Sequence, residues 1–368
     1  MAKVFVHGVP AGASSAVLSA AIRDALLEST NDLEWLSPGE SVLLKPAMNS
    51  GDPYPATTHP ESVWTVARVL KERGANVIVG DKPGVAYVLC DREGSYKGAS
   101  STLFESCGMN QRELNFVGFE ERGWDGYYKF EHPSSSWPSG FYVTRLVDEV
   151  DHVINLPRLS SHAQTGVTLG FKSFVGLLRD DSRMCFHANG PYHTAIRAAS
   201  MKADLDTSDD GADAFFDKIT DISLATRDKL RCTLFTGTKG QVTFGPDRYS
   251  LPIGDRGLLR AHIVEPETGL VFASDDQVAA EVTAIAFLVA LHDSAPWLAK
   301  LQDRVVHGLN RAIGRLGSYG PWQHPFVRRA LAVGLGSPRV TANYSNTPHH
   351  VQHQLNRRLR QADVRQAA

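Results

Sequence analysis

The chain has 368 residues, which is enough for about two domains or one large two-lobed unit. Its net charge of −2, with 42% hydrophobic and 21% charged residues, is ordinary for a globular protein, and we predict neither nucleic acid nor a membrane as a partner. No stretch approaches the roughly 18 uninterrupted apolar residues of a membrane span, and the first residues have no signal-peptide core, so we expect a cytoplasmic protein.

The four cysteines are widely spaced, and none belongs to a C-x-x-C pair. This spacing excludes a ferredoxin module, so we expect no iron–sulfur cluster. Buried or idle thiols in a reducing compartment are the simplest interpretation. The four residues are Cys90, Cys107, Cys185 and Cys232.

A βαβ unit is the first strong pattern along the chain. Thr58 and Glu61 have the spacing of a capping box and predict the start of its helix. Because parallel strands end at the same edge of a sheet, Lys45 and Asp81 should face one common rim, where open α/β sheets bind ligands. The elements predicted so far are a strand at Lys3–His7, a helix at Ala13–Leu27, a strand at Ser41–Lys45, a helix to about Arg73 and a strand at Asn76–Gly80.

The remaining sequence predicts an insertion at residues 86–140, with a strand near Leu114–Phe119, followed by further strands and helices. We predict strands at His152–Leu156 and Leu230–Phe235, a β-hairpin of His262–Val264 with Leu270–Ala273, a helix to Leu291, and helices near 296–316 and 325–333. The fold class is therefore α/β: two-lobed, with a mainly parallel sheet flanked by helices, a β-hairpin and a helical C-terminal part. We expect one domain at residues 1–343 and a polar, basic tail at residues 344–368.

Lys45 directly follows the apolar residues of a buried strand. A lysine there is costly unless it meets a carboxylate or an anion. One alternative is a structural salt bridge to Asp81, and the other is a clamp for a substrate carboxylate or phosphate. In the second case Asn49, Thr57 and Thr58, beside the start of a helix, would add hydrogen-bond donors for the ligand.

Lys172 lies inside an apolar segment and should have a lowered pKa or a fixed anionic partner. His162 precedes it by ten residues, and His187 and His193 follow it. This group suits proton transfer near neutral pH or the binding of a transition metal ion, with His162 and His187 as the candidate ligands. Structural histidines are the alternative.

Several common catalytic motifs are missing from the sequence. It contains no G-x-G-x-x-G fingerprint, no P-loop and no G-x-S-x-G elbow. His349 and His353 are four residues apart but lack the glutamate of H-E-x-x-H. These motifs therefore do not indicate a dinucleotide enzyme, a P-loop NTPase or a classical hydrolase.

The order of several short motifs resembles the domain-of-unknown-function family 362. The matching segments are Leu43–Pro46, Ala56–Pro60, Gly74–Asp81, Ile154–Pro157, His162, Val167–Lys172, Gly176, Phe244–Pro246 and Ala273–Ala280. This family is similar in layout to the nickel-dependent lactate racemase fold, in which histidines move protons. The resemblance implies that His162 and His187 act as acid–base or metal-binding groups and that Lys45 and Lys172 contact an anion or cofactor. Where the family often has Asn, Asp and Asp, this chain has Ser173, Thr236 and Glu281.

We therefore predict an enzyme that acts on a small anionic or polar metabolite by oxidoreductase or isomerase chemistry in an inter-lobe cleft. The predicted catalytic residues are His162, His187 and Lys172, and the predicted ligand-binding residues are Lys45, Asn49, Thr57, Thr58 and Asp81. One rival is a non-catalytic binding protein for an anionic ligand or cofactor. Another is a structural partner that uses the aromatic-rich segment 120–142. We also expect that the chain can form a homodimer, and a monomer or homodimer alone would weaken the structural-partner hypothesis.

Overall fold

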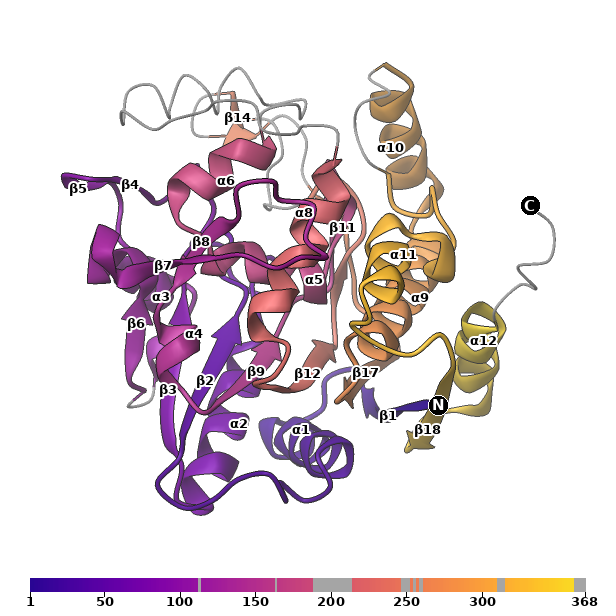
Figure 1. The fold of residues 1–368 in the computed structure, drawn as a ribbon. Coiled ribbons are helices and arrows are strands. Elements are labelled where there is room, and N and C mark those ends of the chain that lie inside the picture. The colour runs from indigo at the N-terminus through magenta and orange to yellow at the C-terminus, as the bar shows by residue number, and fades with distance from the viewer. Residues whose placement is uncertain are drawn as a thin grey trace.

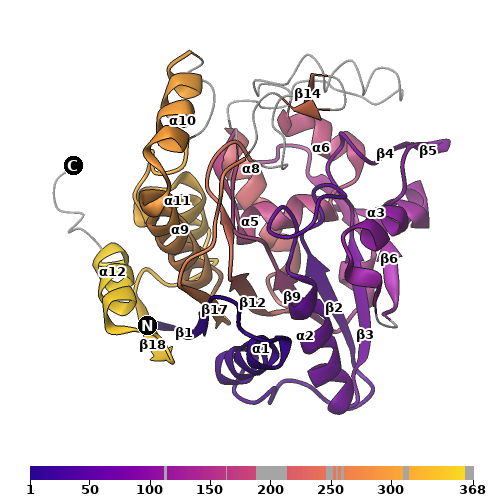
Figure 2. The same cartoon turned by 180° about the vertical axis from the view of Figure 1, so that it is seen from behind.

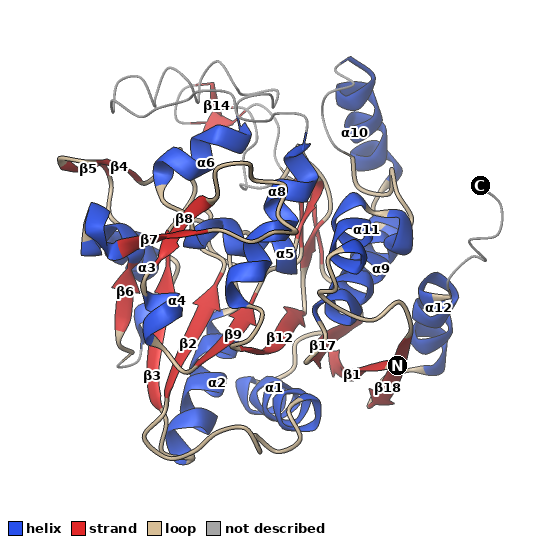
Figure 3. Ribbon diagram, viewed as in Figure 1, coloured by secondary structure: helices blue, strands red, loops and turns tan. Residues whose placement is uncertain are grey.

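The computed structural model describes residues 1–111, 114–162, 164–187, 214–245, 252–253, 256–257, 261–309 and 315–360. Within them, an eight-stranded sheet forms the middle layer of the molecule, with helices on both sides (Figure 1, Figure 3). In spatial order its strands are β18 (Val340–Ser345), β1 (Ala2–Pro10), β17 (Thr268–Ser274), β12 (Leu230–Gly237), β9 (His152–Leu156), β2 (Ser41–Pro46), β3 (Asn76–Asp81) and β6 (Phe116–Gly118).

The sheet is mainly parallel. The pairs from β12 through β9, β2 and β3 to β6 are all parallel, while β17 runs antiparallel to both of its neighbours. The carboxyl ends of β12, β9, β2 and β3 therefore meet at one edge, as the βαβ pattern predicts. The prediction of a mainly parallel sheet flanked by helices is confirmed, and the division into two lobes stays a prediction.

Apolar side chains cover both faces of this sheet, which is why its central strands are almost continuously hydrophobic. In β2, Val42 and Leu44 face one cluster of buried side chains and Leu43 faces the other. The first cluster packs under α1 (Ser15–Ser29) and α2 (Pro60–Glu72), and the second under α9 (Gln277–Ser294) and its neighbours (Figure 2). Three layers result: helices, sheet and helices.

The remaining helices and strands surround these layers. The helices are α3 (Ser100–Ser106), α4 (Leu146–Glu149), α5 (Gly170–Ser173), α6 (Asp180–His187), α8 (Phe215–Asp221), α10 (Trp297–Leu309), α11 (Pro325–Ala332) and α12 (His349–Leu359). The 3-10 helices are η1 (Met109–Gln111), η2 (Phe119–Arg122), η3 (Trp124–Gly126), η4 (Phe174–Leu177), η6 (Ile222–Thr226) and η7 (Pro321–Gln323). The smaller sheets are β11 (Gly166–Thr168), β10 (Ser160–His162), β13 (Gly240–Gln241) and β16 (Ile263–Val264) in one, and the pairs β14 (Pro252–Ile253) with β15 (Arg256–Gly257), β4 (Leu89–Asp91) with β5 (Gly94–Lys97), and β7 (Tyr127–Phe130) with β8 (Phe141–Thr144).

The predicted hairpin around residues 265–269 is wrong in its pairing. Both strands exist as β16 and β17, but β17 pairs with β1 on one side and β12 on the other. Because both edges of β17 are already occupied, β16 pairs with β13 instead. Hairpins do form elsewhere, and β10 with β11 makes the one that carries His162.

The cap of α2 also differs from the predicted capping box. The side chain of His59 caps the helix, because its Nδ1 accepts from the Glu61 backbone N–H. The Thr58 hydroxyl donates to the Leu156 carbonyl and accepts from the Ala47 N–H at 2.8 Å, which leaves it unable to serve the helix. Thr58 therefore ties the loop after β2 to the end of β9.

The C-terminal segment takes part in the fold as far as Leu359. Strand β18 pairs in parallel with β1, and the boundary predicted at 343/344 falls inside it. Helix α12 buries Leu355 and Leu359, and the Leu359 carbonyl accepts from the Trp322 indole N–H at 2.8 Å. The predicted strand at 114–119 is present as the edge strand β6, so the segment 86–140 contributes to the main sheet.

Candidate functional site

Lys45 and Asp81 form a buried ion pair at the carboxyl edge of the sheet. The Lys45 Nζ lies 2.7 Å from Asp81 Oδ1, and the two side chains are 0% and 2% exposed. The ammonium also donates to the Pro46 carbonyl at 2.6 Å and to the Ser173 hydroxyl at 3.4 Å, while Asp81 Oδ2 accepts from the Met48 N–H. Burial lowers the pKa of Lys45, and the charge of Asp81 opposes this shift. The structure thus shows the salt-bridge alternative, and a ligand contact by Lys45 would have to displace one of these partners.

Gly176 closes over this ion pair. A Cβ atom on Gly176 would lie 2.1 Å from Asp81 Oδ1 and 2.8 Å from Lys45 Nζ. Any side chain at this position would therefore collide with the pair. The glycine of the sequence motif is needed for close approach of η4 to the ends of β2 and β3.

The other predicted ligand-binding residues lie in the loop after β2. Thr58 is held by backbone groups, and the Thr57 side chain is fully buried. Asn49 is half-buried, and its carbonyl accepts from the Gly84 N–H at 2.9 Å. These residues shape the loop beside the carboxyl edge, and their contacts with a ligand stay predictions.

Lys172 has a different environment from Lys45. It lies in α5 and is 8% exposed. Burial lowers its pKa to about 7, and the positive charges of Arg183 and Arg158 add to the shift. The sequence-based expectation of a lowered pKa is therefore met by the environment of this lysine. An amine with such a pKa exchanges protons readily near neutral pH.

Two buried arginines supply the positive charge around Lys172. Arg183 lies in α6 and donates to the carbonyls of Lys82 at 2.7 Å, Val175 at 2.9 Å and Pro83. Arg158 follows β9 and donates to the Ala56 carbonyl. These backbone carbonyls orient the two guanidinium groups.

A second buried ion pair lies beside the first. Lys82 directly follows Asp81, and its ammonium contacts Asp180 at the start of α6. The other oxygen of Asp180 accepts from the Cys90 N–H at 2.7 Å. Two of the buried lysines at this edge, Lys45 and Lys82, thus have a carboxylate partner.

Gly170, at the start of α5, is held from both sides by buried polar groups. Glu281 Oε2 accepts from the Gly170 N–H at 2.7 Å, and the Asn155 amide donates to the Gly170 carbonyl at 3.1 Å. Asn155 pairs with Lys45 in the register of β9 and β2. Burial raises the pKa of Glu281 to about 8. This clamp fixes α5, and with it Lys172, relative to strand β9 and helix α9.

His162 lies at the end of β10, and the hydrogen bonds around its ring define its tautomer. Its Nδ1 accepts from the N–H groups of Gln164 at 3.0 Å and Thr165 at 3.4 Å. The neutral ring therefore carries its proton on Nε2. This arrangement disfavours a metal ion at Nε2, which would need a lone pair on that atom.

One of the two predicted metal ligands, His187, lies outside the described side chains. His187 is the last residue of α6, and its side chain lies outside the described part of the chain, as does all of His193. Among the described residues, no group of three or more His, Cys, Asp or Glu side chains could hold a metal ion. Metal binding by His162 and His187 stays a prediction.

Sequence reasoning missed several residues at this edge. Two of them could have been found from the sequence. Arg158 comes after the apolar residues of a buried strand, as Lys45 does. Glu281 is the sole charged residue of the apolar run 277–291. Arg183 and His324 carried no such signal. His324 caps α11 and donates from Nε2 to the Thr165 carbonyl at 3.3 Å, and burial lowers its pKa to about 4, so it acts as a structural neutral group.

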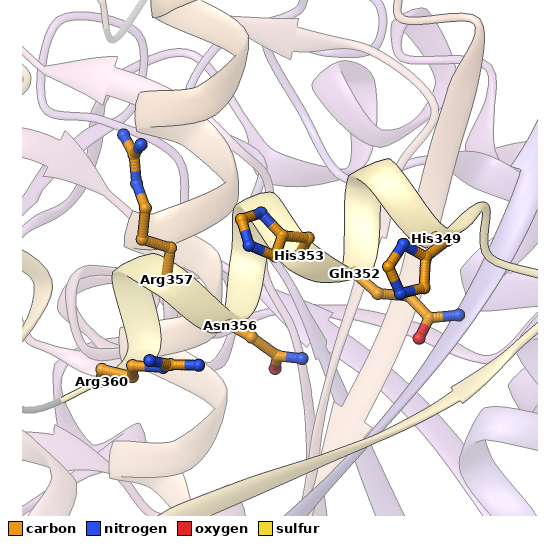
Figure 4. Close-up of a pocket in the computed structure, with 6 residues that line it drawn as sticks. All are labelled: His349, Gln352, His353, Asn356, Arg357 and Arg360. Carbon is orange, nitrogen blue, oxygen red and sulfur yellow. The ribbon is translucent and has the colours of Figure 1, made fainter.

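A shallow hollow lies far from this edge, on the exposed side of α12 (Figure 4). All of its lining residues come from that one helix, so the hollow is part of a surface and does not enclose a ligand. It includes His349 and His353, the pair that lacks the glutamate of a zinc motif. The lining residues are His349, Gln352, His353, Asn356, Arg357 and Arg360.

In the described part of the chain, no single helix is both long and apolar enough to cross a membrane. Helix α9 and the start of α10 reach the required length and composition only when taken together, across a bend of 114°.

Two known proteins are similar to parts of this chain. The thylakoid-associated protein sll1697 of Synechocystis sp. is 30% identical over 155 residues, which are 42% of this chain and 44% of that protein. The chain thus matches less than half of the length of this relative. The lactate racemase apoprotein of Thermoanaerobacterium thermosaccharolyticum is 14% identical, with a TM-score of 0.35, over 63% of this chain and 50% of that structure. Such a low TM-score supports no inference about function.

The family comparison covers the carboxyl edge itself. The model of the family described as Domain of unknown function (DUF362) matches residues 42–286 of the 368. This range begins in β2, ends in α9 and contains Lys45, Asp81, Lys172 and Glu281. Because more than half of the chain matches, the protein belongs to the DUF362 family.

Proposed function

We propose that this protein is an enzyme that binds a small anionic metabolite at the carboxyl edge of its sheet and uses Lys172 to transfer a proton, in an isomerase or oxidoreductase reaction. The observation that carries the proposal is the environment of Lys172 at the carboxyl edge, where its own burial and the charges of the buried Arg183 and Arg158 lower its pKa to about 7. Perturbed amines of this kind concentrate at functional sites.

The charges at this edge favour an anion as the ligand. Arg158, Arg183 and Lys172 bring positive charge to this edge, and the charges of both arginines lower the pKa of Lys172. An anion beside Lys172 would relieve this repulsion and would raise the pKa of the ammonium. A carboxylate or phosphate is therefore a better ligand than a neutral sugar or an amine.

A lysine with a pKa near 7 suits both proposed reaction types. In an isomerisation the neutral amine would accept a proton from the carbon next to the anionic group and return it to another position. In an oxidation it would accept the proton of a substrate hydroxyl while a separately bound organic hydride acceptor takes up the hydride. The Nε2–H of His162 would donate a hydrogen bond to a substrate oxygen, and His187 stays a predicted acid–base partner.

Hydrogen exchange tests the proton transfer even when the product is not identified. The protein would be incubated in D2O with a set of small 2-hydroxy and 2-oxo acids, and loss of C–H signal would be followed by NMR. We expect exchange with the wild type and a loss of at least about a hundredfold with Lys172→Met, since a general base contributes about that much. Lys97→Met is the matched control, because Lys97 is exposed.

Anion binding separates this proposal from a non-catalytic binding protein. The binding of inorganic phosphate and oxalate would be measured by calorimetry on the wild type and on Lys172→Met. Weakened binding together with lost exchange supports the enzyme. Binding by the wild type without exchange of any acid in the set contradicts the enzyme and favours the binding protein.

A further inference from the structure

Helix α10 presents an unusual amount of apolar side chain to solvent. Its residues Trp297, Leu298, Leu301 and Val305 are 69%, 56%, 46% and 52% exposed. In the described part of the chain, only seven large hydrophobic residues are this exposed, and these four lie within nine consecutive positions. Scattered exposed hydrophobic residues need no explanation, but such a concentration indicates an interaction surface.

The four side chains share one side of the helix. Their spacing of i, i+1, i+4 and i+8 places them within an arc of about 100°. The other side of α10 faces the protein, because Ala299 and Asp303 are buried. Helix α10 therefore uses one side to attach to the body and presents the other as an apolar stripe.

The direction of α10 makes this stripe accessible. The chain turns by 114° between α9 and α10, at Ala295 and Pro296. Both views show α10 extending beyond α9 and α11 to the end of the molecule (Figure 1, Figure 2). A single projecting helix forms a convex ridge, which fits a flat, deformable layer better than it fits another convex surface.

The charged residues beside the apolar stripe of α10 indicate the chemistry of the flat layer that the stripe would contact. Arg304 is exposed next to Trp297 and Leu301, and Lys300 is half-buried on the same edge, with its ammonium 3.0 Å from the Asp293 carbonyl. The one acidic residue between 297 and 305, Asp303, is on the buried side. Cations beside a stripe of Trp, Leu and Val are typical of helices that lie in the headgroup region of anionic bilayers.

We propose that α10 is an interfacial anchor that places Trp297, Leu298, Leu301 and Val305 into the headgroup region of an anionic lipid bilayer. Arg304 and Lys300 attract the lipid headgroups. A second copy of the chain presents the same basic edge and has no exposed acidic residue between 297 and 305 to pair with Arg304, so it is less favourable. The proposal departs from the expectation that no membrane is a partner, which was based on the net charge of the whole chain.

Vesicle flotation tests the anchor. The full-length protein would be mixed with vesicles of phosphatidylcholine alone or with about 30 mol% phosphatidylglycerol. We expect the wild type to float with the anionic vesicles and the variant W297S/L301S/V305S to bind at least about tenfold more weakly. Val17→Ser is the matched control, because Val17 is 48% exposed on α1, and it should bind as the wild type does.

Two further measurements keep the result decisive. The variant K300E/R304E keeps the stripe, and we expect it to lose binding to anionic vesicles. Light scattering after size exclusion would report the oligomeric state of the wild type and of the triple variant. The anchor is overturned if the wild type does not bind anionic vesicles or if both variants bind as the wild type does. It is equally overturned if the triple substitution only converts a dimer into a monomer.

Discussion

Two buried lysines at the same edge of the sheet have opposite electrostatic surroundings. Lys45 has a carboxylate at 2.7 Å and two further oxygen acceptors. Lys172 directly precedes Ser173, whose hydroxyl accepts a hydrogen bond from the Lys45 ammonium. The positive charges of Arg183 and Arg158 lower the pKa of Lys172. Burial lowers the pKa of both lysines, but the charge of Asp81 opposes this shift at Lys45, whereas the charges of the two arginines add to it at Lys172.

This contrast teaches that burial alone does not identify a reactive lysine. In the sequence both lysines follow or interrupt apolar runs, and both were predicted to contact a ligand. The structure assigns Lys45 to the joint between β2, β3 and α5, since its ammonium contacts Asp81 and Ser173. Lys172 is the better candidate for chemistry, because the protein supports its neutral form.

The largest expected effect comes from the removal of the charge of Asp81. Asp81→Asn leaves the ammonium of Lys45 buried against a neutral amide, and we expect the free energy of unfolding to fall by about 3–5 kcal/mol at neutral pH. Urea denaturation measures the change. The loss should shrink as the pH rises, because Lys45 can then release its proton instead of remaining charged.

The matched control is Glu72→Gln, which breaks the exposed pair of Arg68 with Glu72 at 3.5 Å. We expect a change below about 0.5 kcal/mol there. If Asp81→Asn costs no more than this control, the ion pair does not stabilise the fold and the contrast with Lys172 has no basis.

A smaller effect should follow when the space over the pair is filled. Gly176→Ala places a methyl group in contact with Asp81 and Lys45, and we expect a loss of about 1–3 kcal/mol in the free energy of unfolding. Combined with Asp81→Asn in a double-mutant cycle, the two changes should be non-additive, because they disturb the same contact. Strict additivity would show that Gly176 does not pack on this pair.

The lowered pKa of Lys172 should make the free energy of unfolding depend on pH. Its folded-state pKa of about 7 lies below the ordinary value of 10.5, so the unfolded chain binds more protons between these values and stability rises with pH across that range. The Lys172→Met variant loses this dependence. Relative to the wild type it should be more stable near pH 7, and its advantage should shrink by at most about 1.4 kcal/mol per pH unit as the pH rises toward 10.

The quantity compared is the difference in free energy of unfolding between the wild type and Lys172→Met at each pH. Other titrating groups, such as Glu281, contribute equally to both proteins and do not change this difference. The exposed Lys97 again provides the control, since Lys97→Met should leave the slope unchanged. Parallel stability curves for the wild type and Lys172→Met would mean that Lys172 titrates in the folded protein as an ordinary lysine, and its proposed role in proton transfer would fail.

The sequence could predict the sheet edge because the relevant signals are local. Apolar runs mark β2, β3 and β9, and the sequence predicts a helix between β2 and β3, so the common edge of Lys45 and Asp81 followed from the βαβ rule. The pairing of β16 could not be predicted in this way. It depends on β17 having neighbours on both sides, and one of them, β1, comes from the other end of the chain.

The environment of Lys172 depends even more on distant segments. Arg183 reaches it from α6, Arg158 from the end of β9, and Glu281 fixes its helix from α9. A window of sequence around Lys172 shows that it is buried but does not show which charges surround it. From burial alone the sequence therefore predicted a lowered pKa or a fixed anionic partner for Lys172, but it could not show that two arginines add to the lowering.

The smallest expected effect tests the one contact that joins the two lysines. Ser173 follows Lys172 and accepts from the Lys45 ammonium at 3.4 Å, which is long for a hydrogen bond. We expect Ser173→Ala to lower the free energy of unfolding by at most about 1 kcal/mol and to leave the pH slope of Lys172 unchanged. Urea denaturation at several pH values measures both quantities. A change in that slope would show that the two lysines titrate as a coupled pair, and the separation between a structural and a reactive lysine would have to be abandoned.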